Sequence, residues 1–158
     1  MPGKDGKEFL QKRINLMIRK LLNTDRNKIE KILVDTNNFN LEEINIAMEL
    51  IDVYINDSNQ KDYEVFVDED GNDINGYVCV GPRPLTAGTY DLYWIAVNPN
   101  VQSKGIGSKL IDYIEKYLKA KSVRLILIET SGKPSYEKER KFYLKNLYKE
   151  LVEIKDFY

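Results

Sequence analysis

Apolar residues in the first half of the chain recur at two spacings, which predict helices followed by a β-hairpin. Residues 25–36 have apolar side chains at helical spacing. Asn40 is a typical N-cap residue, and the apolar positions after it continue a second helix to about residue 56. Residues 63–67 alternate as a strand and residues 74–80 are the returning strand, which predicts a hairpin.

In the second half of the chain, predicted strands alternate with predicted helices. Residues 90–97 form an apolar strand, and a helical pattern follows over residues 106–118. Residues 123–129 are almost continuously apolar, which is typical of a central strand buried on both faces. Residues 134–145 predict a helix with proline in its first turn, and residues 147–154 alternate weakly as a last strand.

The order of these elements indicates an α+β domain with α/β layers, in which helices flank a mixed, mostly antiparallel central sheet. Residues 1–14 are expected to be a tail, and residues 15–158 a single domain. Residues 15–22 fit either a first strand or the end of a short helix. Strict alternation over residues 90–97 gives the strand two faces. One face would present Asp91, Tyr93, Ile95 and Val97, and the other Tyr90, Leu92, Trp94 and Ala96.

The loop before the helix at Ile106 is the most informative segment of the chain. Residues 97–109 have the sequence Val-Asn-Pro-Asn-Val-Gln-Ser-Lys-Gly-Ile-Gly-Ser-Lys. Amides at the start of a helix have no partner inside it, and with the helix dipole they form a site for anions such as phosphate. Gly105 and Gly107 let the backbone approach an anion closely. The alternative is an ordinary glycine-containing turn between a strand and a helix.

Three phosphate-binding motifs can be compared with this loop. The dinucleotide motif Gly-x-Gly-x-x-Gly needs a glycine where the chain has Leu110, and the P-loop motif Gly-x-x-x-x-Gly-Lys-Ser/Thr needs a lysine in place of Ser108. Residues 102–107 match a third pattern, Gln/Arg-x-x-Gly-x-Gly/Ala after a strand that ends in Val-x-Pro. This segment closely resembles the acyl-CoA pyrophosphate loop of the GNAT acetyltransferase superfamily.

The resemblance to GNAT acetyltransferases covers about residues 18–158 and is strongest over residues 92–148. A later helix resembles the family's Arg-x-Phe-Tyr motif. The matching positions are Tyr136, Arg140, Phe142, Tyr143 and Tyr148. Leu147 departs from the pattern, because the family usually has a glycine before this last aromatic residue, and the tight turn there is in doubt. Residues 18–22 resemble the family's opening strand, which favours a strand over residues 15–22.

Composition and charge argue against several other classes of function. The 24 basic and 25 acidic side chains leave no excess positive charge for nucleic acid. The chain has no histidine, which removes Ser-His-Asp and Cys-His catalysis and most zinc sites, and we expect no metal. Its one cysteine, Cys79, suits a reducing compartment and hence a cytoplasmic protein. No apolar run approaches the roughly 20 residues of a membrane span, so no membrane partner is expected.

The acidic segment at residues 68–73 has two interpretations. A calcium-binding EF-hand loop needs a glycine at its sixth position and a glutamate at its twelfth. Counted from Asp68, Gly71 is at the fourth position and Cys79 at the twelfth. A solvent-exposed hairpin turn therefore fits this segment better than a calcium site.

The resemblance implies acetyl-CoA as the acyl-donor substrate. Loop amides would hold its pyrophosphate, and Lys104 would add positive charge. The pantetheine arm would pair with the backbone of Ile95, Ala96 and Val97 as an added strand does, and an N–H of this stretch would stabilise the oxyanion. The loop residues expected to bind CoA are Gln102, Ser103, Lys104, Gly105, Ile106, Gly107 and Ser108.

Acyl transfer to an amine also needs a general acid and a general base. Tyr143 matches the family's helix tyrosine, whose hydroxyl lies near the CoA sulfur, and a phenol with a pKa of about 10 can protonate a leaving thiolate. The alternative for Tyr143 is packing in the core beside Phe142. Asp91 matches the position of a glutamate in histone-acetylating relatives, six residues before the valine matched by Val97. Glu129 competes with Asp91 as the base, and a chain of water molecules is a third candidate.

The sequence therefore predicts an acetyl-CoA-dependent N-acetyltransferase that transfers acetyl directly to a primary amine of a small molecule or peptide. Two alternatives use the same fold without turnover: a sensor that binds acyl-CoA, and a protein-interaction module. The acidic residues Glu42, Glu43 and Asp91 weakly favour a cationic acceptor.

The resemblance also bears on the last strand. GNAT domains usually have one strand beyond the one predicted at residues 147–154, inserted beside residues 123–129, and this chain ends at Tyr158 without it. An open edge on an apolar strand is costly and is a template for another chain. We expect that residues 147–157 shift into this place, that a second subunit donates a strand to form a homodimer, or that the chain is a truncated, weakly stable form.

Overall fold

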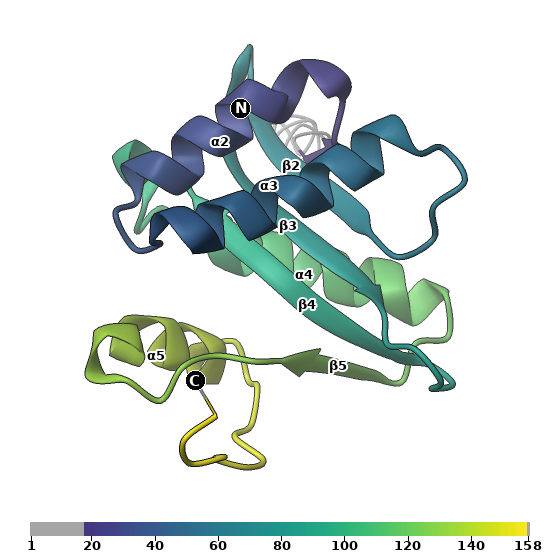
Figure 1. Cartoon of the computed structure of the whole chain (residues 1–158), viewed down its shortest axis with the longest axis vertical. Helices are drawn as coiled ribbons and strands as arrows, with labels where there is room; N and C mark the ends of the chain where they lie inside the picture. Colours follow the sequence, from purple (N-terminus) through teal and green to yellow (C-terminus); the bar gives the residue numbers. More distant parts are fainter. Residues whose placement is uncertain (1–17, 158) are drawn as a thin grey trace, which may run out of the picture. The chain divides into compact units, whose positions relative to one another are not determined.

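The computed structural model describes residues 18–157, which form two compact units divided after Leu127 (Figure 1). The predicted tail at residues 1–14 lies outside the described residues. Of the segment predicted at residues 15–22, the described part begins with a strand, β1 (Ile18–Lys20), as the resemblance favours.

A five-stranded sheet with the order β1-β2-β3-β4-β5 is the centre of the fold. The first four strands pair antiparallel with their sequence neighbours. The remaining strands are β2 (Glu64–Asp70), β3 (Asp73–Pro82), β4 (Thr89–Val97) and β5 (Leu125–Ile128). The predicted α+β class with a mostly antiparallel sheet is confirmed.

Helices cover both faces of this sheet in the first unit. The helices α2 (Arg26–Asp35) and α3 (Leu41–Asn56) lie on one face, and α4 (Ile106–Ala120) lies on the other (Figure 1). The predicted cap of α3 is confirmed, because the Asn40 side chain accepts a 2.9 Å hydrogen bond from the Glu43 amide. The Glu43 carboxylate accepts one of 2.8 Å from the Asn40 amide in return.

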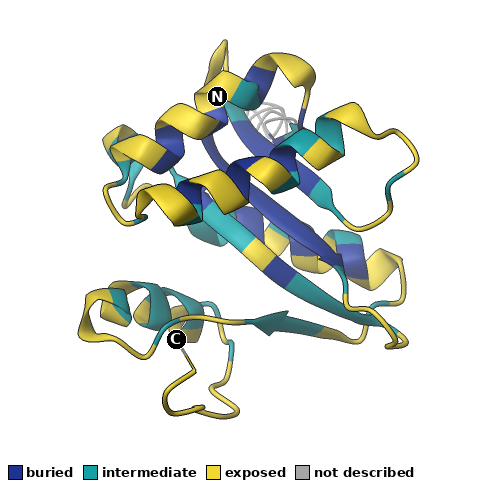
Figure 2. Ribbon diagram, in the orientation of Figure 1, coloured by how far each residue is buried: buried dark blue, intermediate teal, exposed yellow. Residues whose placement is uncertain are grey.

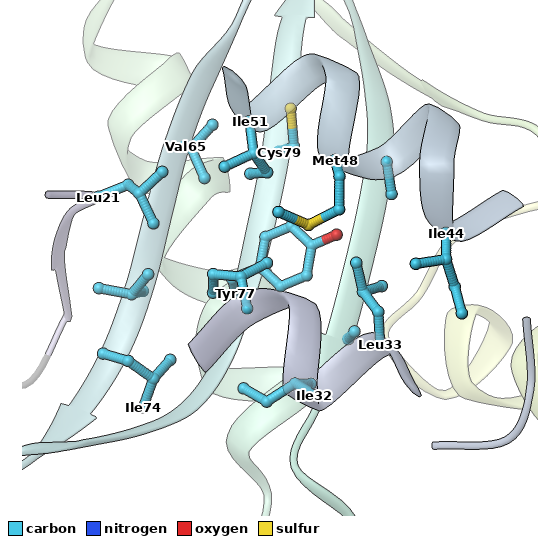
Figure 3. Packing of buried hydrophobic residues seen from close by; sticks show 14 residues of the cluster. Leu21, Ile32, Leu33, Ile44, Met48, Ile51, Val65, Ile74, Tyr77 and Cys79 are labelled. Carbon is cyan, nitrogen blue, oxygen red and sulfur yellow. The ribbon is translucent and has the colours of Figure 1, made fainter. Parts of the chain in front are cut away.

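Buried side chains gather on β2, β3 and the inner faces of α2 and α3 (Figure 2). This core contains Tyr77 and Cys79 of β3, which lie among side chains such as Leu33 and Met48 of the two helices (Figure 3). Burial raises the pKa of the Cys79 thiol, so this cysteine stays a neutral core residue.

A second core lies between the opposite face of the sheet and α4. The ring of Phe66 on β2 packs edge-to-face against Tyr113 and Tyr117, with centroids 5.2 and 4.8 Å apart. At the C-terminal end of α4, the Lys121 ammonium pairs with Glu64 of β2 at 2.5 Å, and the Tyr117 hydroxyl donates to the same carboxylate. Strands β2 and β3 are therefore buried on both faces, since each has a helical layer on either side.

The hairpin differs from its prediction in length. Strands β2 and β3 continue to Asp70 and from Asp73, so the acidic segment at residues 68–73 is mostly strand. Asp68 is fully buried and is not part of a solvent-exposed turn. The predicted hairpin turn does form, at the exposed residues Gly71 and Asn72. Only Asp68 departs from the prediction, because Lys109 and Asn75 compensate its charge in the interior.

A β-bulge at Tyr93 interrupts the alternation of β4. Beyond the bulge Trp94 lies opposite Cys79, whereas before it Leu92 lies opposite Val80. Cys79 and Val80 point to opposite faces of the sheet, so Leu92 and Trp94 do as well. The predicted placement of Leu92 and Trp94 on one face was therefore wrong, because a single extra residue reverses the facing of all positions before it.

Strand β5 is not the buried central strand that its apolar run predicts. It is last in the sheet order, Leu125 is 46% exposed, and its other residues are half-buried. The amides of Arg124 and Leu125 both donate to the Gly88 carbonyl, at 2.8 and 3.2 Å, which fixes β5 against the start of β4. A short apolar run cannot distinguish a central strand from a strand at the end of the sheet.

The second unit contains a helix where the sequence predicts one. A short 3-10 turn, η3 (Pro134–Tyr136), leads into α5 (Glu137–Lys145). The strand predicted at residues 147–154 is absent from the described chain, where these residues form turns and irregular structure. Its apolar side chains, including Leu151 and Val152, are about three-quarters exposed. Weak alternation alone did not produce a strand, since a strand needs a neighbour for its backbone.

The tight turn after α5 does form, although Leu147 replaces the family's usual glycine. The Leu147 amide donates to Leu144 O at 3.0 Å and the Tyr148 amide to Tyr143 O at 3.1 Å, which is the Schellman arrangement. This requires a left-handed backbone at Leu147, whose φ is +69°. A leucine in this conformation is strained, and its side chain is 88% exposed, so packing does not compensate.

Leu147→Gly should stabilise the end of α5 by about 0.5–1 kcal/mol, because glycine adopts a left-handed backbone without strain. Amide hydrogen exchange at residues 147 and 148 should slow in the variant. Leu151→Gly, at another largely exposed leucine that is not left-handed, is the control and should give no protection. Equal protection of these amides in both variants would show that relief of backbone strain at Leu147 is not the cause.

Tyr77→Phe should raise the free energy of unfolding by about 1 kcal/mol, because the Tyr77 hydroxyl is fully buried and has no hydrogen-bond partner among the described residues. Urea denaturation measures this change. Tyr117→Phe, which removes a hydroxyl that donates to Glu64, should lower the free energy of unfolding. A Tyr77→Phe protein that loses stability as Tyr117→Phe does would show that the Tyr77 hydroxyl has a partner.

Candidate functional site

Hydrogen bonds fix the start of the loop between β4 and α4. The Asn98 amide donates to the Asn75 carbonyl of β3 at 2.7 Å, which ties the end of β4 to its neighbour. The Gln102 side-chain amide donates to the Val97 carbonyl at 3.2 Å. Gln102 therefore anchors the loop to the strand end with its side chain, and its backbone continues towards α4.

The remainder of the loop has the backbone geometry of an anion site. Ser103 and Gly105 are both left-handed, with φ of +66° and +79°. Such turns direct successive amides to one side of the chain. A Cβ atom on Gly105 would meet nothing within 4 Å, so the space in front of this residue is open.

The first turn of α4 presents free amides beside this open space. Gly105 is the N-cap residue and supplies no side-chain cap. The first helical bond runs from the Lys109 amide to the Gly105 carbonyl at 3.0 Å. Within the described chain the amides of Ile106, Gly107 and Ser108 have no acceptor, so they can bind an anion at the positive end of the helix dipole.

The charge around the loop comes from two lysines with different surroundings. Lys104 is exposed on the loop itself. Lys109, one turn into α4, has its ammonium 2.8 Å from the Asp68 carboxylate. The sequence does not predict this ion pair, because nothing in the local pattern around Lys109 or Asp68 indicates that these distant residues meet.

Residues Ile95–Val97 of β4 pair with β3 along one edge, opposite Val78, Tyr77 and Gly76 in turn. On the other edge, β5 begins against Gly88 and runs only to Ile128. A strand of that length, starting there, stops short of Ile95. The backbone edge of the three residues predicted to bind pantetheine is therefore not covered by β5.

Asp91 lies away from this loop. It is opposite Gly81, which places it on the sheet face of Cys79 and Trp94, because the bulge reverses its facing relative to Ile95. At about 3.3 Å per residue, Asp91 is roughly 20 Å along β4 from Val97. The Arg83 guanidinium donates to one oxygen of its carboxylate at 2.8 Å, and the side chain is 14% exposed.

Tyr143 and Glu129 belong to the second unit. The Tyr143 ring packs against Phe142 and Tyr148, with centroids 5.3 and 6.3 Å apart. Burial, with a smaller contribution from the negative charge of Glu139, raises the pKa of Tyr143 to about 12. The phenol therefore keeps its proton at neutral pH, as a proton donor must. Glu129 follows β5 and is exposed.

The arginine of the Arg-x-Phe-Tyr motif, Arg140, binds backbone carbonyls. Its guanidinium donates to the carbonyls of Ser131 and Lys133, at 2.6 and 2.9 Å. These bonds fix the segment between Glu129 and α5, so Arg140 has a role in holding the backbone. Its neighbour in the motif, Phe142, packs on the Tyr143 ring.

The described residues offer neither a metal site nor a membrane-spanning helix. Residues 18–157 contain no group of three or more Cys, Asp or Glu side chains placed to hold a metal ion. No helix in this range has the length and apolar character to cross a membrane.

Comparisons with known proteins identify the family of this chain. The model of the acetyltransferase (GNAT) family matches residues 26–147. A crystal structure of a GNAT-family protein from Desulfovibrio desulfuricans is 34% identical, with a TM-score of 0.86, and the match covers 89% of each chain. None of the curated proteins compared matches the chain in sequence.

More distant solved structures share the fold alone. An aminoglycoside acetyltransferase from an uncultured soil metagenomic sample, in complex with sisomicin, is 19% identical with a TM-score of 0.65, over 92% of this chain and 97% of that one. A GNAT acetyltransferase from Brucella melitensis, in complex with acetyl-CoA, is 23% identical with a TM-score of 0.61, over 79% of each chain. Because the family model spans most of the sequence and includes the whole anion loop, this chain belongs to the GNAT family of acetyltransferases.

Proposed function

We propose that this protein is an acetyl-CoA-dependent N-acetyltransferase that transfers the acetyl group directly to a primary amine of a small molecule or peptide. The observation that carries the proposal is the start of α4, where three free amides and the left-handed Gly105 face open space. A pyrophosphate needs several donors that converge with positive potential, and this turn offers them without a competing side-chain cap.

The uncovered edge of Ile95–Val97 supports the same substrate. Pantetheine contains two amide groups in an extended arm, and such an arm can hydrogen-bond to a strand edge as a further strand would. The acetyl thioester would then lie beside β4, where an N–H of the same stretch could donate to the carbonyl oxygen. That bond strengthens as the oxygen becomes negative in the tetrahedral intermediate.

The reaction requires two proton movements. The amine nitrogen attacks the thioester carbon as a neutral amine, so its proton must pass to a base or to water. Collapse of the intermediate breaks the C–S bond, and the thiolate takes a proton from an acid. We assign the acid to Tyr143, because it matches the family's helix tyrosine near the CoA sulfur and its phenol is protonated at neutral pH.

For the base, Asp91, Glu129 and a water chain remain the candidates. Arg83 already occupies one oxygen of Asp91, and the carboxylate lies at the end of β4 away from the loop. Glu129 is exposed and borders the segment that Arg140 fixes. Because Arg83 already pairs with Asp91, we favour a base that acts through water over direct contact by Asp91.

We propose no narrower class of acceptor than a primary amine of a small molecule or peptide. Of the three acidic residues that weakly favour a cationic amine, Glu43 is used in the cap of α3 and Asp91 in its ion pair with Arg83. Glu42 is exposed in the first turn of α3. Aminoglycosides are worth testing first, since a structural neighbour is an aminoglycoside acetyltransferase in complex with sisomicin.

Two measurements on the wild-type protein test the proposed function. Calorimetry should show binding of CoA, and thiol release from acetyl-CoA should accelerate with at least one member of a panel of aminoglycosides, polyamines and peptides. Binding without turnover on any amine would favour the sensor. The absence of CoA binding would favour the interaction module and overturn the proposal.

Gly105→Asp should abolish CoA binding, whereas Gly105→Asn should retain it with at most a modest loss. The two side chains have nearly the same shape, and asparagine tolerates a left-handed backbone, so the comparison isolates the negative charge placed before the amides. Calorimetric titration with CoA measures both variants. Equal affinities would show that no anion binds at this turn.

Tyr143→Phe should lower kcat by at least about tenfold while CoA affinity changes little, because the ring stays and only the proton donor is lost. Steady-state kinetics with the best amine of the panel measure the effect. Tyr148→Phe, at the neighbouring ring, is the matched control and should keep wild-type turnover. If Tyr148→Phe is the impaired variant, Tyr143 is a packing residue and the acid assignment is wrong.

A further inference from the structure

A buried carboxylate lies beneath the first turn of α4. Asp68 is on β2, on the sheet face that α4 covers, and it has no solvent exposure. An isolated charge in such a place is strongly unfavourable, so the carboxylate needs compensation from nearby groups. Its surroundings therefore indicate what this residue does for the fold and for the loop above it.

Two side chains compensate the Asp68 carboxylate. The Lys109 ammonium is 2.8 Å from one oxygen, and the Asn75 side-chain amide donates to the other at 2.8 Å. Lys109 is in the first turns of α4, and its side chain is only 25% exposed. The ion pair thus joins the helix that begins at the anion loop directly to β2.

The residues beside Asp68 also fix the end of the loop that follows β4. The side-chain amide of Asn75 donates to Asp68. The backbone carbonyl of Asn75 accepts the hydrogen bond from the backbone amide of Asn98. The next residue of β3, Gly76, leaves room for α4: a Cβ atom there would be 2.8 Å from the Ala96 carbonyl oxygen and 3.4 Å from the Ile106 side chain. Both ends of the loop therefore rest on the short segment Asn75–Gly76.

We propose that Asp68 and Lys109 are positioning residues for the CoA-binding loop, an inference that rests on the proposed function. Their ion pair holds the first turn of α4 at the angle at which its free amides converge. It also neutralises a carboxylate that would otherwise repel the pyrophosphate through a poorly screened interior. Lys109 acts through Asp68 and is not itself a ligand of the phosphates, because its ammonium is committed to the buried carboxylate.

Three variants test this arrangement: Lys109→Met, Asp68→Asn and the double variant. Lys109→Met should raise the Kd for CoA and the KM for acetyl-CoA by at least about tenfold, because it frees the helix turn and leaves the carboxylate uncompensated. Asp68→Asn should also raise both, by a smaller factor. The double variant should bind CoA no more weakly than Lys109→Met, since both changes break one interaction. The kcat at saturating acetyl-CoA should stay within about twofold in all three.

Lys116→Met is the matched control, because Lys116 is on the same helix and pairs with Asp112 in an exposed position. It should leave the Kd and KM unchanged. Thermal denaturation of each variant shows whether it is folded. If Lys109→Met does not fold, Asp68→Asn alone decides the question, because the two models differ in the sign of its effect.

A direct phosphate contact by Lys109 would give a different pattern. Asp68→Asn would then leave CoA affinity unchanged or improve it, because it releases the lysine for the phosphates. That pattern would overturn the positioning role. Wild-type protein that does not bind CoA would instead refute the proposed function, so the two failures are distinguishable.

Discussion

The structure depends on the burial of one hairpin from both sides. Strands β2 and β3 have α2 and α3 on one face and α4 on the other, so successive residues along them contribute to two different cores. Val65 and Val67 face the first core, whereas Phe66 and Asp68 face α4. A one-residue shift of register in this hairpin would exchange the two sets of side chains, so the hairpin fixes where the helices of the first unit pack.

The candidate site follows from this constraint. The loop before α4 has unfavourable local features, namely a left-handed serine and three amides without an acceptor. Such features persist only when the surrounding structure holds them. Here the support comes from the buried hairpin, through the Asn75 carbonyl and the Asp68 carboxylate. The stable part of the fold thus maintains a turn that would not keep this shape alone.

Local chemistry accounts for what could be predicted from the sequence. The cap of α3 depends on Asn40 and Glu43, which are three residues apart, and the anion loop depends on a short run of glycine and polar residues. The missed features are non-local. The bulge at Tyr93 shows only in the pairing with β3, the burial of Asp68 depends on Lys109 of a later helix, and the exposure of β5 depends on its place in the sheet. Leu147 is the opposite case, because the turn forms despite a residue that disfavours it.

Helix α4 is attached to a single strand at both of its ends. Lys109 near its start pairs with Asp68, and Lys121 just beyond its end pairs with Glu64, both on β2. Side chains alternate across a strand, so Glu64 and Asp68 face the same helix only because an odd number of residues separates them. A single insertion between them would turn one carboxylate away from α4. The distance between Glu64 and Asp68 along β2 is therefore matched to the distance between the two lysines along α4. Insertions or deletions between the two carboxylates keep both on the face of α4 only when they come in pairs of residues.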